Sequence, residues 1–467
     1  MNFKGLFLLL LLSNFSAVSL LAKSQNAGRE GLALYQQGKI KEARVKLHQY
    51  LEDTLRMKTP SYTWWGYYTL AWFEHEVSEH ESALKHSLLA WMAAKKANNP
   101  WMLGRILSWI GWSYASMGHY PLAIEFFKKA IEVGAPNGKI KLVGVWGLST
   151  QELGRIYMKQ GKLKKARKIL TAVYDYAFKR NVGPGISEGG AHLANLNLLE
   201  GNLGEAEKYA KASLRAAHFG NRAKRGSPNN LARSLVTYAR VLYQKSLVLP
   251  SVSGLAEEEI LKALEHCKKM HNKRYLAEAK ILYSKVLVNS NPAVRMQLVE
   301  EALEILKGIK SEVLPMGNLE LGKIYLEEKE VDLAKLYLKE GLKISVKQMQ
   351  VVAQAYIIDE VAVLHGINDN MKAQVRELKK NIIRAKKSRL IPLLYQSYFK
   401  LMKLFESDGY SSLALNWNLK AQTALGTMIK NEKNDELKIS LKNKLFELKM
   451  LEGEFRLSFD NENVFIL

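Results

Sequence analysis

Two clusters in this sequence contain residue types that bind metal ions. The segment HEVSEH holds His75 and His80 with acidic residues between them, and Cys267 is followed four residues later by His271. A zinc-protease helix places its two histidines four residues apart on one face, whereas His75 and His80 are five apart with a predicted turn between them. Cys267 and His271 have helical spacing but no third or fourth ligand nearby. We interpret both clusters as chance surface placements and predict no metal site.

The glycine-rich segment NVGPGISEGG, residues 181–190, invites comparison with a phosphate-binding loop. It lacks the Gly-Lys-Ser/Thr ending of such a loop, and no strand is predicted before it. We interpret it as a loop between two helical units. The sequence shows no Ser-His-Asp signature and no paired-carboxylate signature. We therefore predict that the protein is not an enzyme and uses no cofactor.

Aromatic residues are concentrated in one part of the chain. Eight of the nine tryptophans lie between Trp64 and Trp146, and three of them fall in the run SYTWWGYYTLAWF. Most of these rings must pack in a core. A helix buries one stripe well, however, and the rings of this run surround their helix on nearly every side. Some of them should therefore be left on a binding surface.

The charge of the chain is strongly basic and unevenly distributed. The formal net charge is +24, and half of that excess lies within residues 151–250. Such a field attracts anionic partners and speeds their association. A solvated, lysine-rich helix surface would give the same composition. The single cysteine, Cys267, excludes an intramolecular disulfide, and we predict that it is a core residue.

The elements that position these residues come from an internal repeat. In WIGWSYASMGHYPLAIEFFKKAI, small residues at Gly111 and Ala123 lie on two consecutive predicted helices and allow their backbones to approach closely. Gly118 falls between them, where the chain must turn. The same spacing returns in ELGRIYMKQGKLKKARKILTAV, in ELGKIYLEEKEVDLAKLYLKEGL and in GLALYQQGKIKEARVKLHQYL. The small residue of the second helix recurs at Ala43, Ala83, Ala123, Ala166, Ala206, Ala256, Ala334 and Ala414.

This residue set resembles the tetratricopeptide repeat, with a period near 40 that exceeds the usual 34 of that family. The resemblance implies an all-α fold, a right-handed α-solenoid of about ten helical hairpins over residues 26–430. Two degenerate hairpins should fill residues 274–309 and 351–385. Residues 431–467 should form a capping helix, over about 434–451, and a tail whose pattern is not helical.

The resemblance also implies a concave groove lined by the first helix of each hairpin. The residue that follows the small packing position should face that groove, together with the residue one turn earlier. The first third of the groove would be aromatic, and its middle basic and rich in amides. The predicted groove residues are Tyr68, Trp72, Ser108, Trp112, Gln151, Arg155, Asn195, Arg240 and Lys323.

Three of these residues resemble in part the carboxylate clamps of the family. Arg155, Asn195 and Arg240 lie on neighbouring first helices, and arginine grips a carboxylate with two parallel hydrogen bonds. The hypothesis is that an acidic peptide, or an anionic envelope polymer, lies across them. The alternative is that the arginines pair with acids of this chain such as Glu152 and Glu188, or face water.

The amino terminus has the layout of a secretory signal peptide. Lys4 precedes an apolar run, and small residues follow up to Ala22. We predict removal of residues 1–22, export to the periplasm or the cell exterior, and no membrane span after cleavage; an uncleaved anchor is the alternative. The function predicted is a non-catalytic scaffold of the cell envelope that binds a protein or peptide segment. The rival is a module for envelope glycan or anionic polymer, and nucleic acid is disfavoured because the chain is predicted to be exported.

Export is tested by amino-terminal sequencing of protein purified from its native host. We expect the mature chain to begin between Leu20 and Lys23, because signal peptidase cleaves after small residues that follow the apolar run. Recovery of intact Met1 from the cytosol would contradict export.

Overall fold

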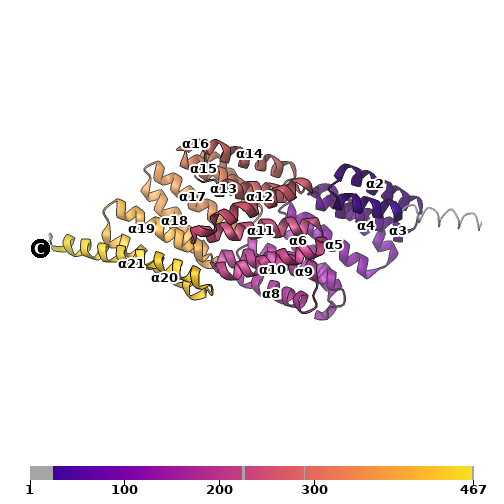
Figure 1. Cartoon of the computed structure of the whole chain (residues 1–467), viewed down its shortest axis with the longest axis horizontal. Coiled ribbons are helices and arrows are strands. Elements are labelled where there is room, and N and C mark those ends of the chain that lie inside the picture. The colour runs from indigo at the N-terminus through magenta and orange to yellow at the C-terminus, as the bar shows by residue number, and fades with distance from the viewer. Residues whose placement is uncertain (1–24, 223–226, 289, 465–467) are drawn as a thin grey trace, which may run out of the picture.

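The structure, a computed structural model, describes residues 25–222, 227–288 and 290–464. Every element in these ranges is a helix, and consecutive helices pack as antiparallel pairs (Figure 1). A helix of which residues 25–36 are described precedes α2 (Ile40–Arg56). The first helices of the next nine hairpins are α3 (Pro60–Glu76), α5 (Pro100–Ser116), α7 (Val143–Lys159), α9 (Gly183–Glu200), α11 (Pro228–Ser246), α13 (Lys273–Val286), α15 (Leu314–Glu327), α17 (Val351–Ile367) and α19 (Ile391–Ser407).

Each first helix pairs with the second helix that follows it. The second helices are α4 (His80–Ala97), α6 (Tyr120–Gly134), α8 (Leu163–Lys179), α10 (Leu203–Arg222), α12 (Ser253–Lys269), α14 (Pro292–Gly308), α16 (Val331–Lys347), α18 (Met371–Ser388) and α20 (Ser411–Asn431). A last helix, α21 (Asp435–Val464), packs on α20. The predicted all-α solenoid of ten hairpins with a capping helix is confirmed, and both degenerate hairpins lie where the spacing places them.

The repeated small residues allow the close approach that the sequence predicts. A Cβ atom on Gly111 would lie 2.9 Å from the ring of Phe127 on the partner helix, and Gly154 and Gly322 meet a leucine in the same way. The alanine of the second helix is fully buried in hairpin after hairpin, as at Ala123 and Ala334. These contacts fix the packing of the two helices within each hairpin.

The turns inside the hairpins contact a second coil of the superhelix. Gly38, Gly118, Gly161 and Gly201 have φ between 71° and 81°, a conformation that favours glycine. Each of these turns also lies against the end of a second helix five hairpins later. The contacted residues are Lys269, Gln348, Ser388 and Met428.

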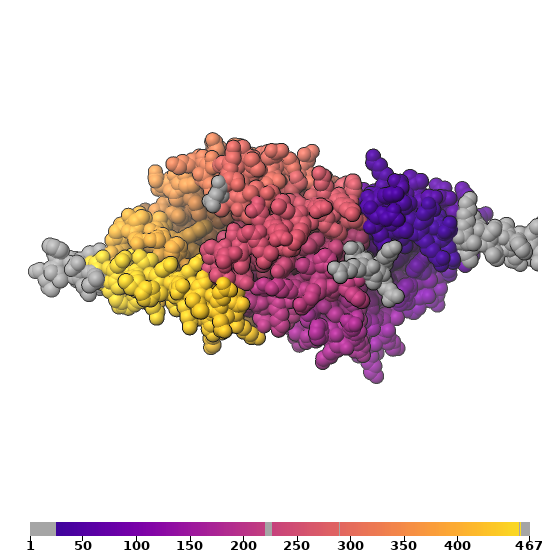
Figure 2. Space-filling model, viewed as in Figure 1, coloured from indigo at the N-terminus to yellow at the C-terminus, as the bar shows by residue number. Residues whose placement is uncertain are grey.

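The ten hairpins therefore wind into two closely stacked coils of five hairpins each. The two coils lie directly against each other on the face drawn in Figure 2. The molecule is elongated, with the first hairpins toward one end and the last toward the other (Figure 1). The first helices line the superhelix axis, since successive first helices from α3 to α13 contact one another, and α7 and α9 of the first coil also contact α17 and α19 of the second.

Two local predictions were wrong. The glycine-rich segment is not a loop, because α9 begins at Gly183; Gly190 has no Cβ and so packs against the backbone of Tyr209. The carboxyl-terminal helix does not stop near residue 451 but continues to Val464. The predicted signal peptide lies outside the described residues. Among the described helices, none combines the length and the apolar character that crossing a bilayer requires.

The close helix contact predicts a large effect of overpacking. Ala123→Trp should lower the free energy of unfolding by about 1–3 kcal/mol or more, because Ala123 is fully buried. Leu122→Trp is the matched control, since Leu122 is 43% exposed. Urea unfolding followed by circular dichroism measures both variants. Equal stability of the two variants would contradict the packing described here.

Candidate functional site

The predicted groove residues line the superhelix axis, and most of them are buried there. Tyr68, Ser108, Trp112, Gln151 and Arg155 are each less than a tenth exposed, whereas Trp72, Asn195, Arg240 and Lys323 are partly buried. The stripe that sequence spacing places on a groove is therefore largely an internal surface. Whether these residues bind a partner stays a prediction.

The aromatic end of the stripe is held by contacts between α3 and α5. Arg105 donates hydrogen bonds to the hydroxyl of Tyr68 from Nε at 2.9 Å and from Nη2 at 2.6 Å. Trp112 stacks on the ring of His75 with the ring centroids 5.0 Å apart. The exposed tryptophan rings of this end are Trp65 and Trp101, at 38% and 40% exposure, which were not among the predicted groove residues.

The basic middle of the stripe forms ion pairs within the chain. Arg155 Nε donates to Glu152 at 2.7 Å, and its Nη1 donates to Glu312, which lies in the connection between α14 and α15. Arg274 and Tyr120 donate to the same Glu312 carboxylate at 2.7 and 2.6 Å. The pairing of Arg155 with Glu152 is the alternative considered from the sequence. Burial alone would raise the pKa of Glu312, but Arg155 and Arg274 hold it below its usual value.

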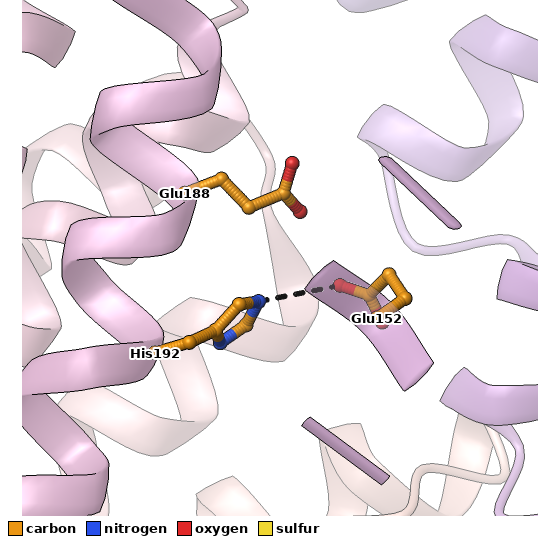
Figure 3. A group of neighbouring side chains, drawn as sticks. All are labelled: Glu152, Glu188 and His192. Carbon is orange, nitrogen blue, oxygen red and sulfur yellow. Dashed lines mark ion pairs between the residues drawn. The ribbon is translucent and has the colours of Figure 1, made fainter. Parts of the chain in front are cut away.

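A second part of this network gathers three potential metal ligands. Glu152 on α7 and Glu188 and His192 on α9 point toward one another, with ligand atoms within 4.8 Å (Figure 3). Each carboxylate is already paired with an arginine, Glu152 with Arg155 and Glu188 with Arg233, both at 2.7 Å. A divalent cation would face two guanidinium groups at this position. We therefore interpret the group as part of a buried ion-pair network.

Burial shifts the pKa values of Glu188 and His192 in opposite directions. It raises the pKa of Glu188 to about 7, with a further contribution from the nearby Glu152 carboxylate. It lowers the pKa of His192 to about 4 despite the hydrogen bond to Glu152. Burial alone would also raise the pKa of Glu152, but Arg155 and His192 hold it well below the usual value.

The HEVSEH segment is not a surface feature, so that interpretation was wrong. His75, Glu76 and His80 are buried where the second hairpin meets the second coil. The Glu76 carboxylate accepts hydrogen bonds from Ser227 at 2.6 Å and from Tyr35 at 2.8 Å. Sequence reasoning missed this role because Ser227 lies 151 positions away and becomes a neighbour only when the coils stack.

Four polar side chains along the axis are only partly buried, those of Lys159, Asn195, Arg240 and Lys323. Arg240 donates to Asn195 at 2.9 Å and to Glu278 at 2.8 Å. Lys159 on α7 and Lys323 on α15 are partly buried and form neither a hydrogen bond nor an ion pair with any other described residue. Burial lowers the pKa of Lys159 although Glu312 and Glu278 act in the opposite direction. The acids nearest Lys159 are thus already paired with arginines.

Comparisons with known proteins agree with this architecture. A family model of the tetratricopeptide repeat matches residues 104–133 and 151–179, within the third and fourth hairpins. A solved structure of a Rap protein complexed with competence and sporulation factor aligns with a TM-score of 0.51 and 11% identity, over 88% of this chain and 99% of that chain. The Rap conjugation gene regulator of plasmid pLS20, in complex with the Phr* peptide, aligns with a TM-score of 0.52 and 15% identity, over 71% of this chain and 97% of that chain. At these identities the likeness shows the fold alone. No curated protein sequence matches this chain.

The buried network predicts how stability changes with pH. The neutral histidines contribute stability above their usual pKa of 6.5 that is lost on acidification, because His75 and His192 have pKa values of about 3 and 4 in the folded chain. Glu188 acts oppositely, since its contribution is complete below its usual 4.5 and is lost as pH rises through about 7. We expect the urea midpoint to fall from pH 7 to pH 5.

Glu188→Gln separates the two contributions. This variant lacks the opposing carboxyl, so its urea midpoint should fall more steeply than that of the wild type between pH 7 and pH 5. Identical slopes for the two proteins would show that Glu188 titrates as it does in the unfolded chain.

Proposed function

We propose that this tetratricopeptide-repeat protein is a non-catalytic scaffold that binds a peptide or protein segment along the axis of its superhelix. The observation that carries the proposal is the pair of axial lysines, Lys159 and Lys323, which form no direct hydrogen bond or ion pair with another described residue, although carboxylates of this chain lie in their surroundings. A partly buried ammonium group that makes no direct ion pair keeps part of its desolvation cost, and a ligand carboxylate would relieve this cost.

The surrounding groups favour an acidic segment. Near Lys159, Glu278 is held by Arg240 and Arg274, and Glu312 by Arg155 and Arg274. The positive charge of Lys159 therefore remains for a ligand. Asn195 accepts a hydrogen bond from Arg240 and donates one to the Ala191 carbonyl, so one of its two amide hydrogens stays available to an extended peptide backbone.

The solved structures support a peptide rather than another ligand. Two Rap-protein structures that share this fold contain a competence and sporulation factor or a Phr* peptide. Stacked helical hairpins recur as peptide-binding surfaces because their first helices present side chains along an extended axis. Release to the cell envelope remains part of this proposal and rests on the amino-terminal sequence.

Selection from a random peptide library tests the proposal. Peptides retained after size-exclusion chromatography are identified by mass spectrometry, and the best is measured by fluorescence polarisation. Lys159→Gln with Lys323→Gln should weaken that peptide by about tenfold or more per lysine, because a charge-assisted hydrogen bond contributes about 1.5–3 kcal/mol. Lys335→Gln with Lys339→Gln, two exposed lysines on α16, is the matched control.

The result can also contradict the proposal. If the library yields no enriched sequence, or if the selected peptide binds both double variants as it binds the wild type, the axis is not the binding site. Melting temperatures of the variants should not fall below that of the wild type, since neither lysine of the axial pair makes a direct hydrogen bond or ion pair whose loss would destabilise the fold and removal of a buried charge relieves its desolvation cost.

A second candidate function, glycan binding, is favoured by the exposed tryptophans. Trp65 and Trp101 are nearly parallel at 25°, with ring centroids 6.4 Å apart, and Arg105 lies over the Trp101 ring. Such a flat aromatic surface can stack against a sugar ring. Trp101→Ser should abolish tryptophan-fluorescence quenching by envelope oligosaccharides while leaving the selected peptide bound. Absence of any quenching in the wild type would exclude this candidate.

A further inference from the structure

One end of the superhelix has a surface that neither the axis nor the peptide proposal uses. The turns within the first five hairpins are covered by the second coil, so the opposite ends of those helices, where one hairpin connects to the next, form a free edge. We define the basic edge as the four connections within residues 52–62, 92–101, 132–146 and 175–185, together with Trp65, Arg105 and Phe219 near the same ends of α3, α5 and α10. In Figure 1 these hairpins lie toward the indigo end of the molecule.

The basic edge is continuous from one connection to the next. Trp65 stacks near Trp101 across the first and second connections, and a Cβ on Gly144 would meet Arg105 at 3.4 Å. Farther along, Trp146 lies edge-on to Tyr176 with the ring centroids 5.2 Å apart. Side chains from four successive connections therefore form one surface.

Cations dominate this surface. Its exposed acids are Glu52, Glu132 and Asp175. Its exposed cations are Arg56, Lys58, Lys95, Lys96, Lys139, Lys141, Lys179 and Arg180. At the opposite end of the superhelix, the turns near residues 327–332, 367–370 and 407–410 carry mainly acids, among them Glu328, Glu330, Asp369 and Asp408. An anionic plane would therefore attract one end of the molecule and repel the other.

Exposed apolar side chains stand among these cations. Leu55 is 38% exposed, Tyr62 37% and Phe178 63%, and Phe219 near the end of α10 is 75% exposed. These residues lie near the ends of α2, α3, α8 and α10. Aromatic and aliphatic tips flanked by lysine and arginine are the combination that suits the boundary between lipid headgroups and acyl chains.

We propose that the basic edge docks the protein on an anionic lipid bilayer. The cations contact lipid headgroups and the apolar tips insert among them, while the acidic end faces away. A flat bilayer can meet all four connections at once, since they share one end of the superhelix. Aliphatic Leu55 gains nothing from stacking on a base or a sugar, whereas it gains from burial in lipid, so the bilayer is favoured over other polyanions.

Sedimentation with vesicles tests this proposal on the full chain. We expect binding to phosphatidylcholine vesicles that contain one-third phosphatidylglycerol, weak binding to phosphatidylcholine alone, and loss of binding in high salt. Lys96→Glu with Lys141→Glu and Lys179→Glu should lower the partition coefficient about 100-fold. The control reverses three exposed lysines on α16 and α18, Lys335, Lys339 and Lys379, and has the same net charge.

A second variant distinguishes lipid from other anions. Phe178→Ser with Phe219→Ser retains every charge and should lower vesicle binding about tenfold or more, because two exposed aromatic groups no longer insert. The proposal is overturned if the edge and control triple variants lose binding equally, if neutral vesicles bind the wild type as well as anionic ones, or if the phenylalanine variant binds vesicles like the wild type. All variants share the amino-terminal segment, so any contribution of that segment to vesicle binding is the same in each and does not affect the comparison.

Discussion

The buried carboxylate of Glu312 is the contact on which the arrangement of this superhelix depends. It lies in the second coil and accepts hydrogen bonds from Tyr120 and Arg155 of the first. The backbone of the same residue donates to Ser116 and accepts from Gln350. An unpaired buried charge costs several kcal/mol, so this residue and its partners hold one another in place. The coils are thereby joined at their axis as well as at their glycine turns.

The burial of these side chains decides what the inner face of the superhelix can do. In an open solenoid the first helices would present their side chains to a partner. In this structure the axial arginines form ion pairs within the chain, so most charges of the axis are already neutralised. The pairs are Arg155 with Glu152, Arg233 with Glu188 and Arg274 with Glu312. The groups that remain for a partner are those whose neighbours are already paired, Lys159 and Lys323 above all. The internal acids thus determine which cations are available.

Stacking of the coils also separates the molecule into two ends of different chemistry. Each coil has two edges. One edge is buried in the contact between the coils, and the other stays exposed. The free edge of the first coil is basic and carries exposed aromatic rings, whereas the free edge of the second is acidic. Peptide binding along the axis and membrane docking through the basic edge use different residues, so either proposal can be wrong without affecting the other.

The sequence by itself determined the local architecture. Gly111, Gly118 and Ala123 recur at fixed spacing because close helix packing and a left-handed turn each demand a small residue, and such demands are visible within about 25 positions. The partners of the axial side chains were decided by the tertiary structure alone. The distance from Arg155 to Glu312 is 157 positions, and that from Glu76 to Ser227 is 151. Such pairs form only if the rotation between successive hairpins adds up to the right angle over five repeats. Small differences in that rotation accumulate from one hairpin to the next. For this reason spacing could place Arg155 on the concave stripe but could not tell whether a partner or an internal glutamate would meet it.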